Sequence, residues 1–209
     1  MGTSPKIVYM GTPDFSLEPL KVLMEQMSVV LVVSKPDAIV GRKKVLTSSP
    51  VKKLAMENDI PVFTPESIKK DYQSIIDAQP DLIVTCAYGK IIPKELIDYP
   101  KYGCVNIHAS LLPKYRGSAP IQWALINGES ETGITLMYMD EFMDTLDFAN
   151  CLFTCLPEVC GTKVSSKQIY FTKPKSSTFT SSRSHLLNNL LINITTLSYR
   201  FFYFSTYHF

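Results

Sequence analysis

The segment Lys6-Ile-Val-Tyr-Met-Gly11 is a short apolar run that ends at a glycine, a pattern typical of a buried strand that enters a turn. Similar apolar runs follow at residues 29–33, 82–86, 104–108 and 134–139. Segments that favour helices lie between several of these runs. Continuously apolar strands that alternate with helices indicate an α/β fold, with a mostly parallel sheet and helices on both faces.

The helices are expected at residues 17–27, 51–57, 65–78 and 119–126. The connection over residues 34–50 shows neither pattern and is expected to be a loop. Two cysteines on predicted strands and the single tryptophan are expected to pack in the core: Cys86, Cys104 and Trp123.

The loops after the strands are where a binding site is expected, because ligands of open parallel sheets lie beyond the carboxyl ends of the strands. Four loops fit this description, at residues 11–15, 34–42, 86–89 and 106–117. None contains GxGxxG or GxxxxGK[ST], so the usual dinucleotide-binding and triphosphate-binding loops are excluded.

The composition changes near residue 148. Residues 1–148 carry 15 of the 21 basic residues and 18 of the 19 acidic residues, a net charge of −3. Residues 149–209 carry six basic residues and one acid, a net charge of +5, together with 11 of the 23 aromatic residues. We therefore expect one functional domain over residues 1–148. We expect residues 149–209 to be an atypical tail, either poorly ordered or the product of an incorrect gene model.

Several protein classes are not expected. No apolar run reaches the roughly 18–20 residues of a membrane-spanning helix, and the first residues do not resemble a secretory signal. The five cysteines show no spacing typical of a disulfide framework or a zinc site, which favours a reducing cytoplasm and no bound metal. The formal net charge of +2 does not by itself indicate a nucleic-acid partner.

One predicted strand end concentrates residues that can perform chemistry. Asn106 and His108 are two residues apart, so their side chains project from the same face of an extended strand. An amide donor beside an imidazole suits acyl transfer, because the amide binds a developing oxyanion while the imidazole exchanges a proton. Asp144 is a candidate to orient the imidazole, with Asp140 and Asp147 as rivals. A histidine without a catalytic role, packed near the surface or core, remains the alternative reading.

The pattern Asn106-x-His-x-Ser-Leu-Leu-Pro-x-Tyr-Arg-Gly117 resembles the signature of the 10-formyltetrahydrofolate-dependent formyltransferases. Further motifs over residues 6–147 resemble those of the methionyl-tRNA formyltransferases within this family, in the same order. They are Met10–Phe15, Lys35–Asp37, Gly41–Lys44, Pro50–Lys52, Pro61–Phe63, Ala87–Gly89, Gly117–Ile121 and Glu131–Gly133.

This resemblance implies a Rossmann-like formyltransferase fold and a formyltransferase catalytic domain over residues 1–148. The implied reaction moves a formyl group from 10-formyltetrahydrofolate to the amino group of methionyl initiator tRNA, in translation initiation. It implies a monomeric, metal-free enzyme. The implied catalytic residues are Asn106, His108 and Asp144. The implied folate-binding residues are Ser110, Leu111, Leu112, Pro113, Ala87, Tyr88 and Gly89. The implied tRNA-binding residues are Arg42, Lys43 and Lys44.

The sequence departs from the family pattern after Asp144. Leu146 stands where the family has glycine, and Phe142 replaces another glycine two residues before the acid. Glycine permits a positive φ or a close backbone approach that leucine and phenylalanine do not. The family's C-terminal barrel is also not recognisable in these 209 residues. Three alternatives therefore stay open: an impaired folate-binding or tRNA-binding remnant, a fragment without a stable fold, and another formyl-folate enzyme, such as glycinamide ribonucleotide formyltransferase.

Overall fold

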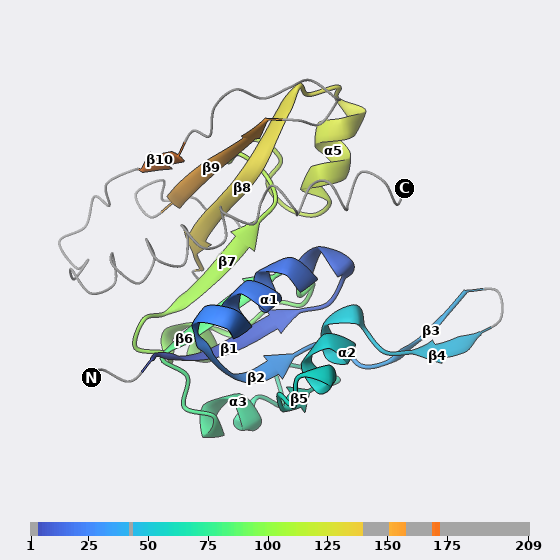
Figure 1. Cartoon of the computed structure of the whole chain (residues 1–209), viewed down its shortest axis with the longest axis vertical. Helices are drawn as coiled ribbons and strands as arrows, with labels where there is room; N and C mark the ends of the chain where they lie inside the picture. Colours follow the sequence, from blue (N-terminus) through green and yellow to red (C-terminus); the bar gives the residue numbers. More distant parts are fainter. Residues whose placement is uncertain (1–3, 42–43, 140–150, 158–168, 172–209) are drawn as a thin grey trace. The chain divides into compact units, whose positions relative to one another are not determined.

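Figure 1 shows the computed structural model of the chain, which describes residues 4–41, 44–139, 151–157 and 169–171. The chain divides into two compact units, Met1–Val105 and Asn106–Phe209. Their boundary lies inside strand β7 (Cys104–His108). Most of the predicted tail lies outside the described residues, so the domain boundary at residue 148 stays a prediction.

The first unit contains a parallel sheet with the strand order β6-β1-β2-β5. These strands are β1 (Lys6–Gly11), β2 (Ser28–Val33), β5 (Val62–Phe63) and β6 (Leu82–Cys86). The four residues from Ile7 to Met10 are fully buried in β1. Successive side chains of a strand point to opposite faces, so β1 is covered on both faces as well as paired on both edges.

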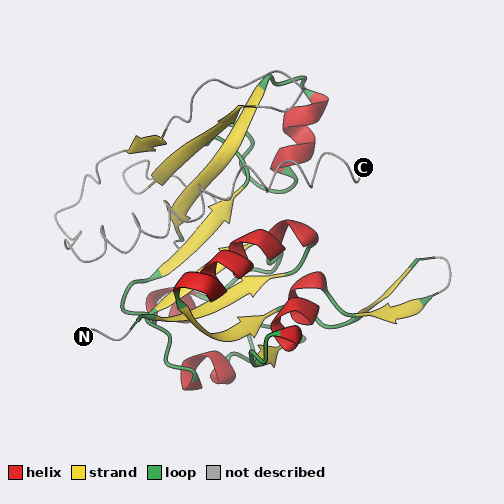
Figure 2. Cartoon of the chain, viewed as in Figure 1, coloured by secondary structure: helices red, strands yellow, loops and turns green. Residues whose placement is uncertain are grey.

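Helices α1 (Leu17–Gln26) and α2 (Pro50–Glu57) contact each other and β2, so they lie on the same face of this sheet (Figure 2). After β5 the chain reverses direction across the sheet and returns to the other side of β1. Helix α3 (Gln73–Asp77) lies in the connection from β5 to β6, and α4 (Lys94–Asp98) lies in the connection from β6 to β7. The predicted α/β fold, with a mostly parallel sheet, is confirmed. Its strand order switches between β1 and β6.

The turn after β1 is closed by a short 3₁₀ helix, η1 (Asp14–Ser16). Ser16 occupies the N-cap position of α1, but its hydroxyl does not cap that helix. It donates instead to the carbonyl oxygen of Cys86 at the end of β6, over 2.6 Å. The buried Tyr9 hydroxyl donates to the carbonyl oxygen of Ser16 over 2.7 Å. These two bonds fix the turn that follows β1 against the end of β6.

We predict that Gly11→Ala destabilises this turn through close packing. A Cβ at Gly11 lies 2.8 Å from Ser16 Cβ and 2.9 Å from Tyr9 Cε1, and both neighbours are buried. Because neither can move freely, we expect the free energy of unfolding to fall by about 2 kcal/mol in urea denaturation. Gly41→Ala is the comparison, because a Cβ there meets open space and only the positive φ of 74° is strained. An equal or larger loss at Gly41 would contradict the packing argument.

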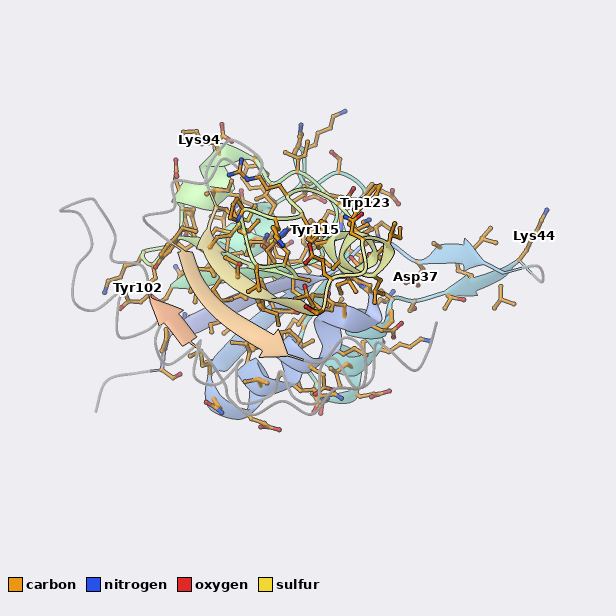
Figure 3. All side chains as sticks on the ribbon, turned by 90° about the horizontal axis from the view of Figure 1, so that it is seen from above. Asp37, Lys44, Lys94, Tyr102, Tyr115 and Trp123 are labelled. Carbon is orange, nitrogen blue, oxygen red and sulfur yellow. The ribbon has the colours of Figure 1, made fainter. Side chains whose placement is uncertain are left out.

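The predicted loop after β2 contains a hairpin of β3 (Ala38–Val40) and β4 (Val45–Thr47). The expectation of an irregular loop over residues 34–50 is therefore wrong. Each strand has three residues, too few for a periodic pattern to stand out. Asp37 and Lys52 brace the base of the hairpin with an ion pair of 2.9 Å, and exposed Lys44 lies at the far end (Figure 3).

The second unit has the strand order β10-β9-β8-β7. Its remaining elements are α5 (Pro120–Ile126), β8 (Glu131–Tyr138), β9 (Cys151–Pro157) and β10 (Ile169–Phe171). The pairs β8–β9 and β9–β10 are antiparallel. The core of this unit includes Ile107 on β7, Ala124 on α5 and Ile134 on β8.

Two further predictions differ from the structure. The helix expected over residues 65–78 is reduced to α3, and Lys90 Nζ donates to the carbonyl oxygens of Pro65 and Glu66 in the segment before it. Trp123 is 51% exposed, so its assignment to the core is wrong. On the short α5, Ala124 is the buried residue instead.

Cys86 and Cys104 are buried as predicted. Among the described residues, no helix is long and apolar enough to cross a membrane.

Candidate functional site

The candidate site of the second unit begins at the end of β7. Asn106 is half-buried and His108 is 7% exposed. Ile107 between them is buried, which agrees with the alternation of a strand and places Asn106 and His108 on the same face. Asn106 and His108 therefore lie on one face of β7, as expected for residues two apart on a strand.

The imidazole of His108 is held by the loop that follows it. His108 Nε2 lies 3.0 Å from the carbonyl oxygen of Tyr115. A carbonyl oxygen can only accept a hydrogen bond, so Nε2 carries the proton that is donated. In a neutral imidazole the other nitrogen, Nδ1, is then the acceptor. The contact thus selects one tautomer, which is a necessary condition for directed proton transfer.

The start of this loop is fixed to β8 by Thr135, which is fully buried. Thr135 Oγ1 donates to the carbonyl oxygen of Ser110 over 2.6 Å and accepts from the backbone N–H of Leu112 over 3.2 Å. The Ser110 hydroxyl donates to the carbonyl oxygen of Lys114 over 2.8 Å, and the Leu112–Pro113 bond is cis. One threonine therefore satisfies two backbone groups of the segment that resembles a folate-binding motif.

The end of the loop is held from the turn between α5 and β8. The Tyr115 hydroxyl donates to Glu129 Oε1 over 2.7 Å, and Lys114 Nζ pairs with the same carboxylate at 3.0 Å. Asn127 Nδ2 donates to the Tyr115 hydroxyl over 3.1 Å. The hydrogen bond from Tyr115, followed by that from Lys114, lowers the pKa of Glu129 below its usual value. Glu129 is therefore an anionic acceptor for both neighbours at neutral pH.

The first unit has its own candidate surface, where the carboxyl ends of β1 and β6 meet. Thr12 Oγ1 donates to the carbonyl oxygen of Tyr88 over 3.2 Å. Ala87 and Gly89 have positive φ angles of 48° and 72°. Lys35 Nζ lies 2.6 Å from the position of a Cβ on Gly89, but this flexible side chain can move aside, so the positive φ is what favours glycine here. The predicted loops at residues 11–15, 34–42 and 86–89 therefore meet at the switch in strand order.

Tyr88 is an unusual member of this surface. Its side chain is 3% exposed, and its hydroxyl has no hydrogen-bond partner within the described part of the chain. Burial raises the pKa of this hydroxyl to about 12, so it stays protonated at neutral pH. A buried hydroxyl without a partner carries a cost of about 1–3 kcal/mol, which a polar ligand atom can offset.

Some predicted site residues cannot be placed. Asp144 and its rivals Asp140 and Asp147 lie outside the described residues, as do Arg42 and Lys43. Of the predicted folate-binding residues, Ala87, Tyr88 and Gly89 belong to the first unit. The others, Ser110, Leu111, Leu112 and Pro113, belong to the second unit. Within the described ranges, no cluster of three or more histidine, cysteine or acidic residues suits a metal ion.

The sequence reasoning missed two residues that shape the second unit's site. Thr135 carries a weak signal, a polar residue inside the apolar run of β8. Glu129 follows the Asn-Gly pair that ends α5, a position that reads as ordinary turn chemistry. The sequence does not show that either residue contacts the loop after His108, because that contact depends on the path of the loop in space.

Comparison with characterised proteins shows where this chain belongs. Residues 6–149 match the family model described as formyl transferase. The methionyl-tRNA formyltransferase of Carboxydothermus hydrogenoformans is 54% identical over 145 residues, which are 69% of this chain and 47% of that protein. The enzyme of the same name from Lactiplantibacillus plantarum is 57% identical over 144 residues, 68% of this chain and 45% of that protein. The chain thus spans about half the length of the curated relatives it matches.

Solved structures show the same fold. Glycinamide ribonucleotide transformylase 1 from Geobacillus kaustophilus superposes with a TM-score of 0.59 at 24% identity, covering 77% of this chain and 86% of that one. At this identity the likeness concerns the fold alone. The family match covers both the unit that carries Thr12 and Tyr88 and the strand that carries Asn106 and His108. The chain belongs to the formyl transferase family.

Proposed function

We propose that the chain transfers a formyl group from 10-formyltetrahydrofolate to the amino group of methionyl initiator tRNA. The observation that carries this proposal is the 54% identity to a methionyl-tRNA formyltransferase over 145 residues. Family membership supports a folate-derived formyl donor in general. The identity to proteins of this name favours methionyl-tRNA over glycinamide ribonucleotide, because the likeness to a solved glycinamide ribonucleotide transformylase, at 24% identity, concerns the fold alone.

In this proposal Asn106 and His108 act on the formyl group. The Asn106 amide donates to the carbonyl oxygen as negative charge develops on it, and His108 supplies the exchangeable proton. Because Nε2–H is committed to the Tyr115 carbonyl, Nδ1 is the nitrogen that accepts and returns the proton. Asp144 completes the proposed set as a carboxylate that helps remove the proton of the amine. The amine nitrogen bonds to the formyl carbon and loses a proton to Nδ1, the bond between the formyl carbon and the folate nitrogen breaks, and the folate nitrogen takes up that proton as it leaves.

The residues proposed to bind the folate donor form two segments, each described within its own unit. On the second unit, half-buried Leu111 and exposed Pro113 offer apolar surface, while Ser110 and Leu112 are buried and hold the segment in place. On the first unit, the backbone of Ala87, Tyr88 and Gly89 offers polar groups to a pterin ring. The buried Tyr88 hydroxyl, which lacks a partner among the described residues, suits a polar ligand atom.

The β3–β4 hairpin is the proposed contact for the acceptor end of the tRNA. Arg42, Lys43 and Lys44 are consecutive in sequence, and Lys44 is exposed at the end of the hairpin. Basic side chains that neutralise phosphates make binding depend on salt. We predict that replacing all three with alanine raises the KM for tRNA about tenfold at low salt. The dependence of log KM on log salt should become shallower by about 2 units, with kcat changed little. An unchanged salt dependence would exclude the hairpin from tRNA binding.

The experiment that tests the function is a formylation assay with the purified full chain. Labelled formyl from 10-formyltetrahydrofolate is offered to methionyl initiator tRNA, to the same tRNA without methionine, and to glycinamide ribonucleotide. Transfer to methionyl-tRNA alone is the expected result. Transfer to glycinamide ribonucleotide alone would overturn the substrate assignment. Folate binding without transfer to either acceptor would identify the chain as a binding remnant.

A further inference from the structure

A polar cluster outside the proposed catalytic set connects to His108 through the backbone. We call it the Tyr115 clasp, and its members are Lys114, Tyr115, Asn127 and Glu129. All four residues and His108 lie in the second unit, and every link between them is a described hydrogen bond. The clasp holds the side chain of the same residue whose carbonyl oxygen accepts from the imidazole.

The backbone conformation of Asn127 and Glu129 is fixed by the hydrogen bonds that end α5. The N–H of Gly128 donates to Leu125 O over 3.1 Å, and the N–H of Glu129 donates to Ala124 O over 3.0 Å. Gly128 has a φ of 63°, so these bonds form the left-handed helix ending known as a Schellman motif. Ala124 is buried, which ties the motif to the core of the unit. Asn127 and Glu129 therefore start from a backbone with little freedom.

The hydrogen bonds of the clasp run in one direction. Asn127 donates to the Tyr115 hydroxyl, and this hydroxyl donates to Glu129, which also accepts from Lys114. Every donor thus has an acceptor of suitable charge, and the anionic acceptor makes the Tyr115 bond stronger than a neutral one. The hydroxyl of Tyr115 is therefore bound by Asn127 and Glu129, which both lie on the turn after α5.

Holding the ring matters because the Tyr115 backbone is unusual. Its φ is 56°, a left-handed conformation that is unfavourable for a residue with a large side chain. Without support, the residue tends to return to a negative φ, which rotates its peptide groups. Its carbonyl oxygen then no longer faces His108 Nε2, now 3.0 Å away. The side-chain clasp therefore stabilises the backbone conformation that the imidazole contact requires.

We propose that Glu129 is a positioning residue, which fixes His108 as the Nε2-protonated tautomer by clasping Tyr115. This inference deepens the proposed function and rests on it for its catalytic consequence, but the tautomer is a property of the protein alone. Lys114 contributes less, because its side chain is 64% exposed and its ion pair is weakened by solvent.

The first test is a long-range ¹H–¹⁵N NMR spectrum of the labelled full chain at a pH where imidazoles are neutral. A His108→Gln spectrum identifies the His108 signals among those of the three histidines. Wild type should show the pattern of an Nε2-protonated ring. Glu129→Ala should shift it toward the average of two tautomers. Glu129→Gln, which keeps an oxygen to accept from Tyr115, should keep most of the wild-type pattern. Glu25→Ala, on the exposed face of α1, is the matched acidic control and should change nothing.

Tyr115→Phe supplies a second variant, which removes the hydroxyl but keeps the backbone carbonyl. It should shift the His108 pattern in the same way as Glu129→Ala, and the double variant should shift it no further, because both changes break one link. If both single variants keep the wild-type tautomer pattern while remaining folded, the proposal is overturned. Should Glu129→Ala fail to fold, the Tyr115→Phe spectrum alone decides.

Kinetics then connect the clasp to the reaction. In the formylation assay Glu129→Ala should lower kcat about tenfold with the KM for tRNA changed less than about twofold, because Glu129 is outside the proposed tRNA-binding residues and its loss displaces the imidazole. A raised KM with unchanged kcat would overturn the positioning role. If wild type does not formylate tRNA but the tautomer shifts as expected, the proposed function fails while the positioning of His108 stands.

Discussion

Replacing His108 with glutamine is expected to lower kcat for formyl transfer by about 100- to 10,000-fold. Glutamine is chosen because its amide N–H can still donate to the Tyr115 carbonyl, as Nε2 does now. The loop should then keep its path, while the ring nitrogen that exchanges a proton is lost. Initial rates with methionyl initiator tRNA at saturating folate measure the effect.

Two comparisons make this result specific. His108→Ala loses both the proton carrier and the contact with Tyr115, so it should be at least as slow and also less stable. Asn106→Ala should lower kcat by about 100- to 1,000-fold through the loss of an oxyanion donor. A His108→Gln protein that keeps activity within threefold of wild type would remove the imidazole from the mechanism.

The second large effect is expected at Thr135. Valine has the same shape as threonine but lacks the hydroxyl that binds the carbonyl of Ser110 and the N–H of Leu112. Since Thr135 is fully buried, Thr135→Val leaves both groups without this partner. Each such group costs about 1–3 kcal/mol, so the free energy of unfolding should fall by about 3 kcal/mol. Urea denaturation followed by circular dichroism measures this loss.

Thr135→Ser is the matched control, because it keeps the hydroxyl and loses one methyl group. We expect it to cost about 1 kcal/mol, clearly less than the valine variant. The valine variant should also bind folate more weakly, since the segment from Ser110 to Pro113 loses its anchor on β8. If valine is tolerated better than serine, packing rather than hydrogen bonding holds this loop.

Much of the fold could be predicted because its signals are local. The strands β1, β2 and β6 are largely continuous apolar runs, and burial on both faces of a parallel sheet requires such runs. The β3–β4 hairpin was missed because its strands are too short to show a period. Trp123 was misplaced because α5 has apolar side chains around most of its surface, and a single sequence does not reveal which side faces the core.

In the candidate site, too, features that depend on neighbouring residues could be predicted, and features that depend on residues distant in the sequence could not. The shared strand face of Asn106 and His108 follows from the two-residue period of a strand, so it could be predicted from the sequence. The contact between His108 and Tyr115 depends on a non-glycine residue with a positive φ, which residue preferences argue against. Glu129 and Thr135 reach the loop from positions 14 and 25 residues away from their partners, and no local pattern encodes such distances.

The central place of β1 in its sheet has a consequence during synthesis on the ribosome. Three hydrogen bonds join the region of β1 to that of β6 across 70 to 76 residues of sequence: Ser16 to Cys86, Lys6 to Asp81, and Thr12 to Tyr88. A nascent chain that ends after β5 can pair β1 with β2 but leaves its other edge exposed. That edge is filled only when residues 82–86 emerge. β1 is thus enclosed on both edges only after β6 is made, and until then its free edge is open to aggregation.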